Sequence, residues 1–219
     1  MSADSLQEIA RAVIEGDDEA VVKLTRSALD AGLPVDQIID DGMMQGMTVV
    51  GERFKKDLMF IPEVMMSAQA MNKGMELVRP HVAPGTRRKS GRVVIGTVQG
   101  DIHDIGKNLV KMMLEASGLE VLDLGVDVSP ATFVEGAASS QADIVCMSAL
   151  LTTTISSMAN TIDALKEAGI KDRVKVMVGG SPVTADFARE IGADGYEPDA
   201  GSAAQTALRL CETRKGMTS

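Results

Sequence analysis

The N-terminal part of the chain places apolar residues three and four positions apart, as amphipathic helices do. Glycine and proline interrupt this pattern at positions typical of helix ends, near Gly16, Gly32, Pro34 and Pro62. Asp17 is placed to cap the second of the resulting segments. Four helices with short connections predict an antiparallel bundle over residues 1–80.

From residue 92 on, short β-branched runs alternate with helical stretches. The predicted strands are 92–97, 120–123, 143–147, 174–178 and 194–196. The predicted helices are 105–117, 130–139, 154–168, 182–191 and 199–213. This alternation predicts an α/β domain over residues 92–219, in which helices cover both faces of a five-stranded parallel sheet in a flavodoxin-like, doubly wound arrangement. Residues 81–91, which contain proline, glycine and a basic run, are expected to link this domain to the helical bundle.

Composition and charge narrow the possible functions. The net charge of −9 argues against nucleic acid or an anionic membrane as the main partner. No apolar run approaches the roughly 20 residues that span a bilayer, and the polar, acidic start is unlike a signal peptide, so we expect a cytoplasmic protein. Cys146 and Cys211 are not a disulfide framework or a zinc site. Cys146 lies in an apolar run, where a small buried side chain is expected.

Candidate chemistry is concentrated directly after the predicted strands. The segments are 100–106 after the first strand, 148–154 after the third, 179–181 after the fourth and 199–201 after the fifth. Because the carboxyl ends of parallel strands meet at one edge of a sheet, these segments are expected to converge there, where doubly wound sheets bind their ligands.

The first of these segments holds His103, one of only two histidines, between Asp101 and Asp104. The nearby glycines lack the spacing of a dinucleotide fingerprint, no phosphate-binding GK[ST] loop is present, and a phospho-receiver domain would carry an aspartate where Ser148 stands. A zinc site usually requires three protein ligands. Two interpretations stay open. His103 is either a structural residue that caps the helix beginning at 105, or the single ligand of a metal already held in a macrocycle, with Asp101 bonded to its other ring nitrogen.

The segment Gly100 to Gly106 matches the DxHxxG motif, and here the chain resembles the cobalamin-binding domains of the methionine synthase type. Ser148-Ala149-Leu150 resembles the SxL element of that family, and Gly179-Gly180 resembles its GG element. The run 50–64 is similar to the family's helical cap domain. In size and layout the chain resembles the free-standing corrinoid proteins of methanogens and acetogens, which serve methyl transfer from methanol, methylamines, betaines or aryl methyl ethers.

The resemblance implies a role for the residues around the histidine. His103 would be the lower axial ligand of cobalt in a cobalamin or related corrinoid, and Asp101 would be its hydrogen-bond partner. Thr154 would be the third member of this proton relay, where the family has a serine. The other implied contacts of this segment with the cofactor are Gly100, Ile102, Asp104, Ile105 and Gly106.

Further cofactor contacts are implied on both sides of the corrin. Ser148, Leu150 and Thr152 would lie along the displaced nucleotide tail, where Gly179 and Gly180 would leave room for it. Asp199 and Ala200 would lie beside the tail at the start of the last helix. On the upper face, the residues that would shield the cobalt are Phe54, Ile61 and Val64.

The resemblance also implies a function, that of a carrier subunit without catalysis independent of its cofactor. Cobalt in the Co(I) state would accept a methyl group from a substrate-specific methyltransferase, giving methyl-Co(III). A second methyltransferase would pass the methyl group to a thiol or to tetrahydrofolate, and a reductive activation protein is a third implied partner. The linker would act as a hinge for the bundle. The alternative is a cobalamin-binding regulator or sensor, which would usually carry a DNA-binding or signalling domain.

Overall fold

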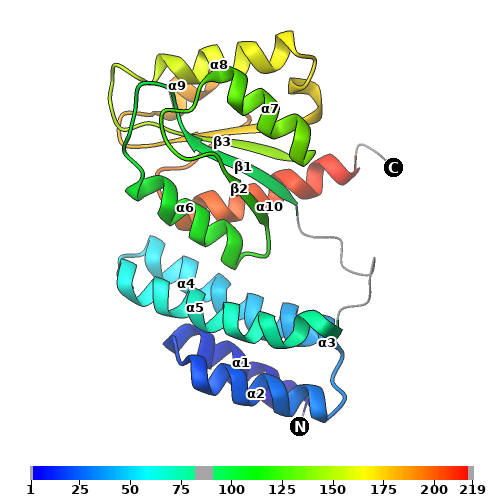
Figure 1. Ribbon diagram of the computed structural model, residues 1–219. Helices are drawn as coiled ribbons and strands as arrows, with labels where there is room; N and C mark the ends of the chain where they lie inside the picture. The colour runs from blue at the N-terminus through cyan, green and yellow to red at the C-terminus, as the bar shows by residue number, and fades with distance from the viewer. Residues whose placement is uncertain (1, 82–90, 217–219) are drawn as a thin grey trace. The chain divides into compact units, whose positions relative to one another are not determined.

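The computed structural model describes residues 2–81 and 91–216 of the chain. Contacts within the chain divide it into two compact units, Met1–Arg88 and Lys89–Ser219 (Figure 1). The predicted linker and its hinge fall on residues 81–91, and of these 82–90 lie outside the described residues. None of the described helices combines the length and the apolar composition that crossing a membrane requires.

The first unit contains the four predicted helical stretches. Its elements are α1 (Ser2–Glu15), α2 (Asp18–Asp30), α3 (Val35–Gln37), η1 (Ile38–Met44), α4 (Gln45–Lys55), α5 (Ile61–Val78) and η2 (Arg79–His81). Asp17 caps α2 as expected, because its Oδ1 accepts the N–H of Ala20 at 2.9 Å. Apolar side chains that recur at helical spacing, such as Ile9, Val21 and Met71, are buried between the helices.

The third helical stretch has a feature that the sequence pattern does not predict. Its middle turns, η1, form a π-helix between α3 and α4. Two glycines in this region face α1: a Cβ at Gly42 would lie 3.2 Å from Ile9 Cγ2, and a Cβ at Gly46 would lie 2.7 Å from the carbonyl oxygen of Ala10. The stretch is therefore helical throughout, but close contact with α1 accompanies a local change in its hydrogen-bond period.

The second unit is a doubly wound α/β domain, as predicted. Its strands are β1 (Arg92–Thr97), β2 (Glu120–Asp123), β3 (Ile144–Ser148), β4 (Lys175–Gly179) and β5 (Gly195–Tyr196). All four strand pairings are parallel, and the strand order is β2-β1-β3-β4-β5, the flavodoxin-like order.

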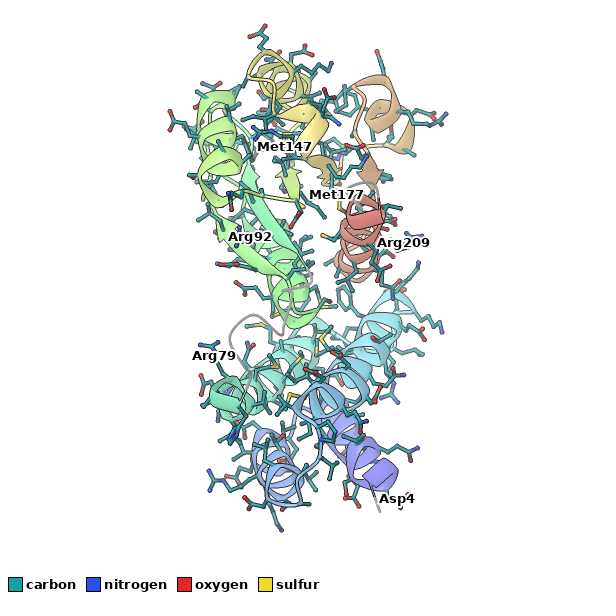
Figure 2. All side chains as sticks on the ribbon, turned by 90° about the vertical axis from the view of Figure 1, so that its right-hand side faces the viewer. Asp4, Arg79, Arg92, Met147, Met177 and Arg209 are labelled. Carbon is teal, nitrogen blue, oxygen red and sulfur yellow. The ribbon has the colours of Figure 1, made fainter. Side chains whose placement is uncertain are left out.

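Helices cover both faces of this sheet. They are α6 (Ile105–Ala116), α7 (Pro130–Ser140), α8 (Ser156–Glu167), η3 (Lys171–Arg173), α9 (Ala185–Glu190) and α10 (Ala200–Gly216). Helices α6 and α10 pack together on one face, and α7 and α8 on the other (Figure 1). Two buried methionines on neighbouring strands lie on opposite faces of the sheet (Figure 2). Met147 belongs to the core on the α7–α8 side, while Met177 lies close to α10 residues.

The register of the central strands aligns their carboxyl ends in one row. Thr97 of β1 pairs with Ser148 of β3, and Ser148 pairs with Gly179 of β4. The chain leaves the sheet at or just after each of these three residues. The loops that follow β1, β3 and β4 therefore begin side by side, which brings together segments about fifty and eighty residues apart in sequence.

Candidate functional site

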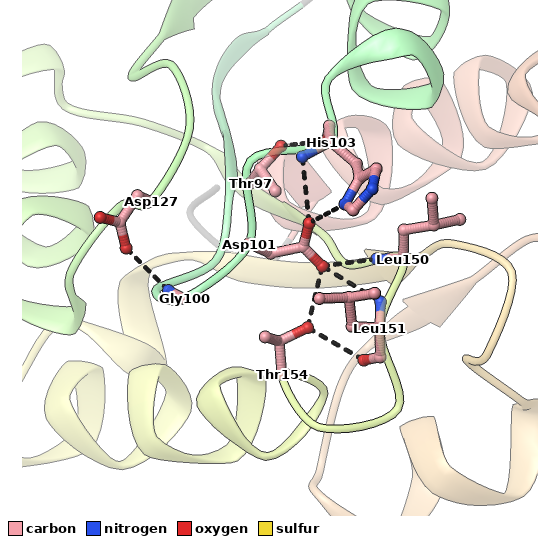
Figure 3. Close-up of polar contacts among 8 residues, drawn as sticks. All are labelled: Thr97, Gly100, Asp101, His103, Asp127, Leu150, Leu151 and Thr154. Carbon is pink, nitrogen blue, oxygen red and sulfur yellow. Dashed lines mark hydrogen bonds and ion pairs between the residues drawn. The ribbon is translucent and has the colours of Figure 1, made fainter.

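A buried carboxylate, that of Asp101, is the centre of the site at this edge. Its Oδ1 accepts the backbone N–H of His103 at 3.0 Å and lies 2.7 Å from the Nδ1 of the same residue. Its Oδ2 accepts the backbone N–H groups of Leu150 at 2.8 Å and Leu151 at 3.1 Å. The hydroxyl of Thr154 lies 2.8 Å from that oxygen (Figure 3). One carboxylate thus joins the loop after β1 to the loop after β3.

These contacts decide the protonation of Asp101. Burial alone raises the pKa of this carboxyl group. Hydrogen bonds from the backbone of His103 and Leu150, and from the side chains of His103 and Thr154, outweigh burial and hold the pKa well below its usual range. Asp101 is therefore ionised at neutral pH.

The ionised carboxylate sets the tautomer of His103. A carboxylate has only acceptor atoms, so the Nδ1 that faces it must carry the hydrogen. In the neutral ring, Nε2 then carries the free lone pair. The side chain of His103 is 46% exposed, and Nε2 makes no hydrogen bond within the part of the chain that the structure describes. The lone pair of His103 Nε2 is therefore held in a defined orientation at the surface, where it can bind a metal.

Local structure does not support the capping interpretation of His103. Helix α6 begins at Ile105 and its N-cap residue is Asp104, whose Oδ2 accepts from the Asn108 side chain at 3.0 Å. The carbonyl oxygen of His103 accepts instead from the buried hydroxyl of Thr97, at 3.0 Å. The ring of His103 therefore takes no part in capping α6.

The donor set around His103 is too small for a bare metal ion. Among residues 2–81 and 91–216, no group of three or more histidine, cysteine, aspartate or glutamate side chains is arranged to hold a metal. A single imidazole with one hydrogen-bonded carboxylate suits a metal that brings most of its ligands with it. The residues present therefore fit a macrocyclic metal cofactor.

Large apolar side chains are exposed on the two segments that meet at this site. Ile102 and Ile105, on either side of His103 in the motif, are 73% and 80% exposed. Leu150 and Leu151, whose backbone N–H groups bind Asp101, also expose their side chains. Four exposed branched side chains on the segments that carry His103 and hold Asp101 are typical of a site that binds a largely hydrophobic ligand.

Gly106 and Gly180 are glycines for different reasons. A Cβ added at Gly106 would meet no atom within 4 Å, and its φ is not left-handed, so the fold does not require glycine there. Gly180 has φ +126°, and a Cβ there would lie 1.9 Å from the carbonyl oxygen of Ala149. The fold itself thus requires Gly180, independently of the room for a ligand that was predicted. At Gly179 a Cβ would make only an ordinary contact, 3.6 Å from the carbonyl oxygen of Glu197.

The other predicted contacts lie in several environments. Ser148 is partly buried, and its carbonyl oxygen accepts the N–H of Val98 at 3.0 Å. Thr152 is exposed on the loop after β3. Asp199 caps α10, since its carboxylate accepts from the N–H and the hydroxyl of Ser202 at 2.8 and 2.9 Å, and Ala200 is buried.

The residues predicted to shield the upper face belong to the helical unit. Phe54 is partly buried near the end of α4, and Ile61 is exposed at the start of α5. Val64, one turn further along α5, is completely buried. Val64 therefore offers no surface to a ligand in this conformation, because at helical spacing it falls on the core side of α5.

Three residues of the site are absent from the sequence prediction: Thr97, Leu151 and Asp127. Leu151 contributes a backbone N–H and an exposed side chain, and Thr97 holds the carbonyl group of His103. Asp127, after β2, accepts the N–H of Gly100 at 2.7 Å. A signal was present for Thr97, because a hydroxyl residue ending a strand beside the motif is well placed to bond it. Asp127 is distant in sequence and carries no motif.

Comparison with known proteins agrees with this geometry. Residues 91–205 match a family model described as a B12 binding domain, and residues 5–79 match a second model with the same description. A corrinoid protein of Desulfitobacterium hafniense is 41% identical over 208 residues, covering 94% of this chain and 96% of the relative. Dimethylamine corrinoid protein 3 of Methanosarcina acetivorans is 43% identical over 205 residues, covering 94% and 96%.

A solved structure shows the same architecture. The methanol:cobalamin methyltransferase complex MtaBC from Methanosarcina barkeri contains a chain that superposes with a TM-score of 0.82 at 34% identity, covering 95% of this chain and 80% of that one. The similarity extends over both compact units, since it includes nearly all of the sequence.

Proposed function

Because this chain belongs to the family of corrinoid proteins with a B12-binding domain, we propose that it carries a methyl group between methyltransferases on a bound corrinoid. The observation that supports this most strongly is the pair of Asp101 and His103, which presents Nε2 as a single oriented donor. A bound corrin would supply four equatorial nitrogens to cobalt and the site at which the methyl group is held. His103 would complete the lower axial position.

The chain's own residues would orient and protect this site. Asp101 keeps the Nδ1 hydrogen in place, so Nε2 stays available as a ligand. Whenever Nε2 is not used as a ligand it can take up a proton, and the same carboxylate would stabilise the imidazolium. Thr154 would support Asp101 through its hydroxyl as the third relay member. Ile102, Ile105, Leu150 and Leu151 would contact the lower face of the corrin, and the open space at Gly106 would let it approach.

The remaining contacts are also part of the proposal. Ser148, Thr152, Gly179 and Ala200 would line the nucleotide tail, while Asp199 would hold the start of α10 beside it. Phe54 and Ile61 would shield the upper face. The helical domain would span residues 1–80 and the cofactor-binding domain residues 92–219, with 81–91 as the link between them.

The proposed partners are a substrate-specific methyltransferase, a second methyltransferase that transfers to a thiol or to tetrahydrofolate, and a reductive activation protein, all in the cytoplasm. A methyltransferase partner is supported by the similarity to a chain of MtaBC, a methanol:cobalamin methyltransferase complex. The names of the relatives refer to dimethylamine in one case, at 43% identity, and to methanol in another, at 34% identity. We therefore assign the donor to the partner enzyme and propose a methylated small molecule of this class. The relatives give the regulatory alternative no support.

The proposal is tested by asking which atom binds cobalt from below. The protein is prepared with ¹⁵N-labelled histidine, loaded with cobalamin and reduced to the Co(II) state for electron paramagnetic resonance. A ¹⁴N ligand splits each line of the Co(II) spectrum into a triplet, whereas ¹⁵N from a labelled histidine ligand splits it into a doublet. We expect His103→Ala to abolish the doublets, and His81→Ala, which changes the only other histidine, to retain them. Triplets in the labelled wild-type protein would contradict the assignment.

Carrier activity needs a second measurement. The loaded protein is incubated with a methylamine or methanol methyltransferase and its substrate, and formation of the methylated cofactor is followed by absorbance. We expect methylation only when enzyme, substrate and loaded protein are combined. No methylation with any of these enzymes would refute the proposed role while leaving cofactor binding intact.

A further inference from the structure

We propose that Asp127 is a positioning residue for His103, acting through the turn that carries Asp101; this rests on the proposed role of His103 as a cobalt ligand. Asp127 lies on the loop between β2 and α7, outside every motif of the sequence. It contacts the two residues that begin the histidine-bearing loop.

Asp127 holds this turn from both sides. Its Oδ1 accepts the backbone N–H of Gly100 at 2.7 Å (Figure 3). Its own backbone N–H donates to the carbonyl oxygen of Asp101 at 2.9 Å. The two bonds flank the peptide that joins Gly100 to Asp101. Displacement of this turn away from the loop after β2, which would move the Asp101 side chain, breaks at least one of them.

The backbone of Asp127 adopts an uncommon conformation to make these bonds. Its φ is +52°, in the left-handed region that aspartate and asparagine tolerate better than most residues. The residue it holds, Gly100, also has a positive φ, +85°. Two left-handed residues thus meet across the two loops, and the hydrogen bond between them helps to offset the cost of this conformation at Asp127.

The loop that carries Asp127 is fixed to the sheet. The N–H of Thr97 donates to the carbonyl oxygen of Gly125 at 3.0 Å, and the N–H of Val128 donates to that of Thr97 at 2.9 Å. Val98 and Val128 form a parallel bridge, and both are buried. Asp127 is exposed, but its backbone is anchored on β1 through its neighbours.

The carboxylate of Asp101 is consequently restrained from two directions. The loop after β3 holds its Oδ2 through Leu150, Leu151 and Thr154, and Asp127 holds its backbone from the side of β2. Only the remaining oxygen, Oδ1, is directed at His103. Loss of the Asp127 contacts would let the turn shift away from the loop after β2, so the imidazole would be less well oriented for cobalt.

Two substitutions separate the hydrogen bond from the backbone conformation. Asp127→Gly adopts the left-handed conformation readily but removes the acceptor for the Gly100 N–H. Asp127→Asn keeps an acceptor oxygen and also tolerates this conformation. Gln141→Gly is the matched control, because Gln141 is an exposed residue with φ +52° whose side chain accepts from Arg92, at the C-cap of α7.

The variants are loaded with cobalamin in the full chain with ¹⁵N-labelled histidine. Affinity is measured by absorbance titration, and histidine ligation by the nitrogen doublets in the Co(II) state at saturating cobalamin. We expect Asp127→Gly to weaken binding about tenfold, as for loss of a hydrogen bond to a charged group, and to reduce the doublet intensity. Asp127→Asn should stay within about twofold of wild type, and Gln141→Gly should match wild type in both measurements.

The outcomes distinguish this inference from the proposed function. If His103→Ala abolishes the doublets but Asp127→Gly binds cobalamin and gives doublets like wild type, the inference on Asp127 is wrong and the ligand assignment stands. A lower melting temperature of Asp127→Gly with unchanged doublets would assign Asp127 to folding alone and also overturn it. Equal losses in Asp127→Asn and Asp127→Gly would refute the hydrogen-bond basis. Doublets that survive in His103→Ala would refute both proposals.

Discussion

The Oγ1 of Thr154 lies 2.8 Å from the Oδ2 of Asp101, joining residues 53 positions apart in sequence. The same hydroxyl lies 2.9 Å from the carbonyl oxygen of Leu151, so its hydrogen can be shared between two acceptors. The methyl group that distinguishes threonine from serine is accommodated beside Gly100, where an added Cβ would lie 3.4 Å from Thr154 Cγ2. The space beside Gly100 therefore accommodates the methyl group of Thr154.

Replacing this hydroxyl should weaken the site and the fold together. Thr154→Val keeps the shape of the side chain but removes a hydrogen bond to a buried charge, so we expect the free energy of unfolding to fall by about 2 kcal/mol. Thr154→Ser keeps the hydroxyl and should cost about 1 kcal/mol or less. Chemical denaturation of the three proteins measures both differences. Equal stability of the valine variant and wild type would show that the hydroxyl is not bonded to Asp101.

The stability of the cofactor-free protein should depend on pH through Asp101. Its pKa in the folded state lies below the unfolded value of about 3.9, so the unfolded chain takes up the proton first as the pH falls. The contribution of Asp101 is therefore complete above about pH 5 and declines at lower pH, by up to about 1.4 kcal/mol per pH unit. Denaturation curves between neutral pH and about pH 3 measure this slope.

Comparison of wild type with Asp101→Asn isolates the contribution of Asp101 to the pH dependence of stability. Burial opposes ionisation of Asp123 and Asp194 as well, but hydrogen bonds from lysines and backbone N–H groups hold their pKa values below the usual range. Both aspartates remain in the variant, so its acid dependence should be shallower but not absent. Identical slopes in the two proteins would mean that the pKa of Asp101 is not lowered.

Gly106→Ala should have opposite effects on folding and on cofactor binding. The residue lies in the first turn of α6 with open space around it, so alanine should stabilise the cofactor-free protein, by up to about 1 kcal/mol. The added methyl group would occupy space that the corrin is proposed to approach, and binding should weaken. Thermal melting and cobalamin titration test the two parts. Unchanged affinity would show that the cofactor does not use this space.

Gly180→Ala should damage the fold even without cofactor. Its Cβ would overlap the backbone of Ala149, at a φ that disfavours side chains, so we expect a loss of about 3 kcal/mol or more. Gly192→Ala is the control, because φ is also positive there but the space is open, and it should cost about 1 kcal/mol. Denaturation of both variants gives the difference. Similar costs would indicate that the loop after β4 can move away from Ala149.

Much of the fold was predictable because burial leaves a local pattern. The strand β1 follows directly from its run of buried aliphatic residues, and the parallel order from the alternation of strands and helices. The start of helix α8 was not predicted correctly from its pattern. It begins at Ser156 rather than at 154, because the backbone and hydroxyl of Thr154 bond the preceding turn. The π-helix η1 had no sequence signal, since it accompanies close packing against α1.

The sequence by itself determined the order of elements, the edge at which the loops meet and the pairing of His103 with Asp101, which are only two residues apart. Tertiary structure alone decided what holds that pair. Hydrogen bonds hold the pair from the N–H groups of Leu150 and Leu151, and Asp127 bonds Gly100 beside it; all depend on the paths of the loops after β2 and β3. The burial of Val64 depends on how α5 packs. Hydrophobic patterns indicate which residues are buried, whereas strand register and loop geometry determine which residues distant in sequence form hydrogen bonds with one another.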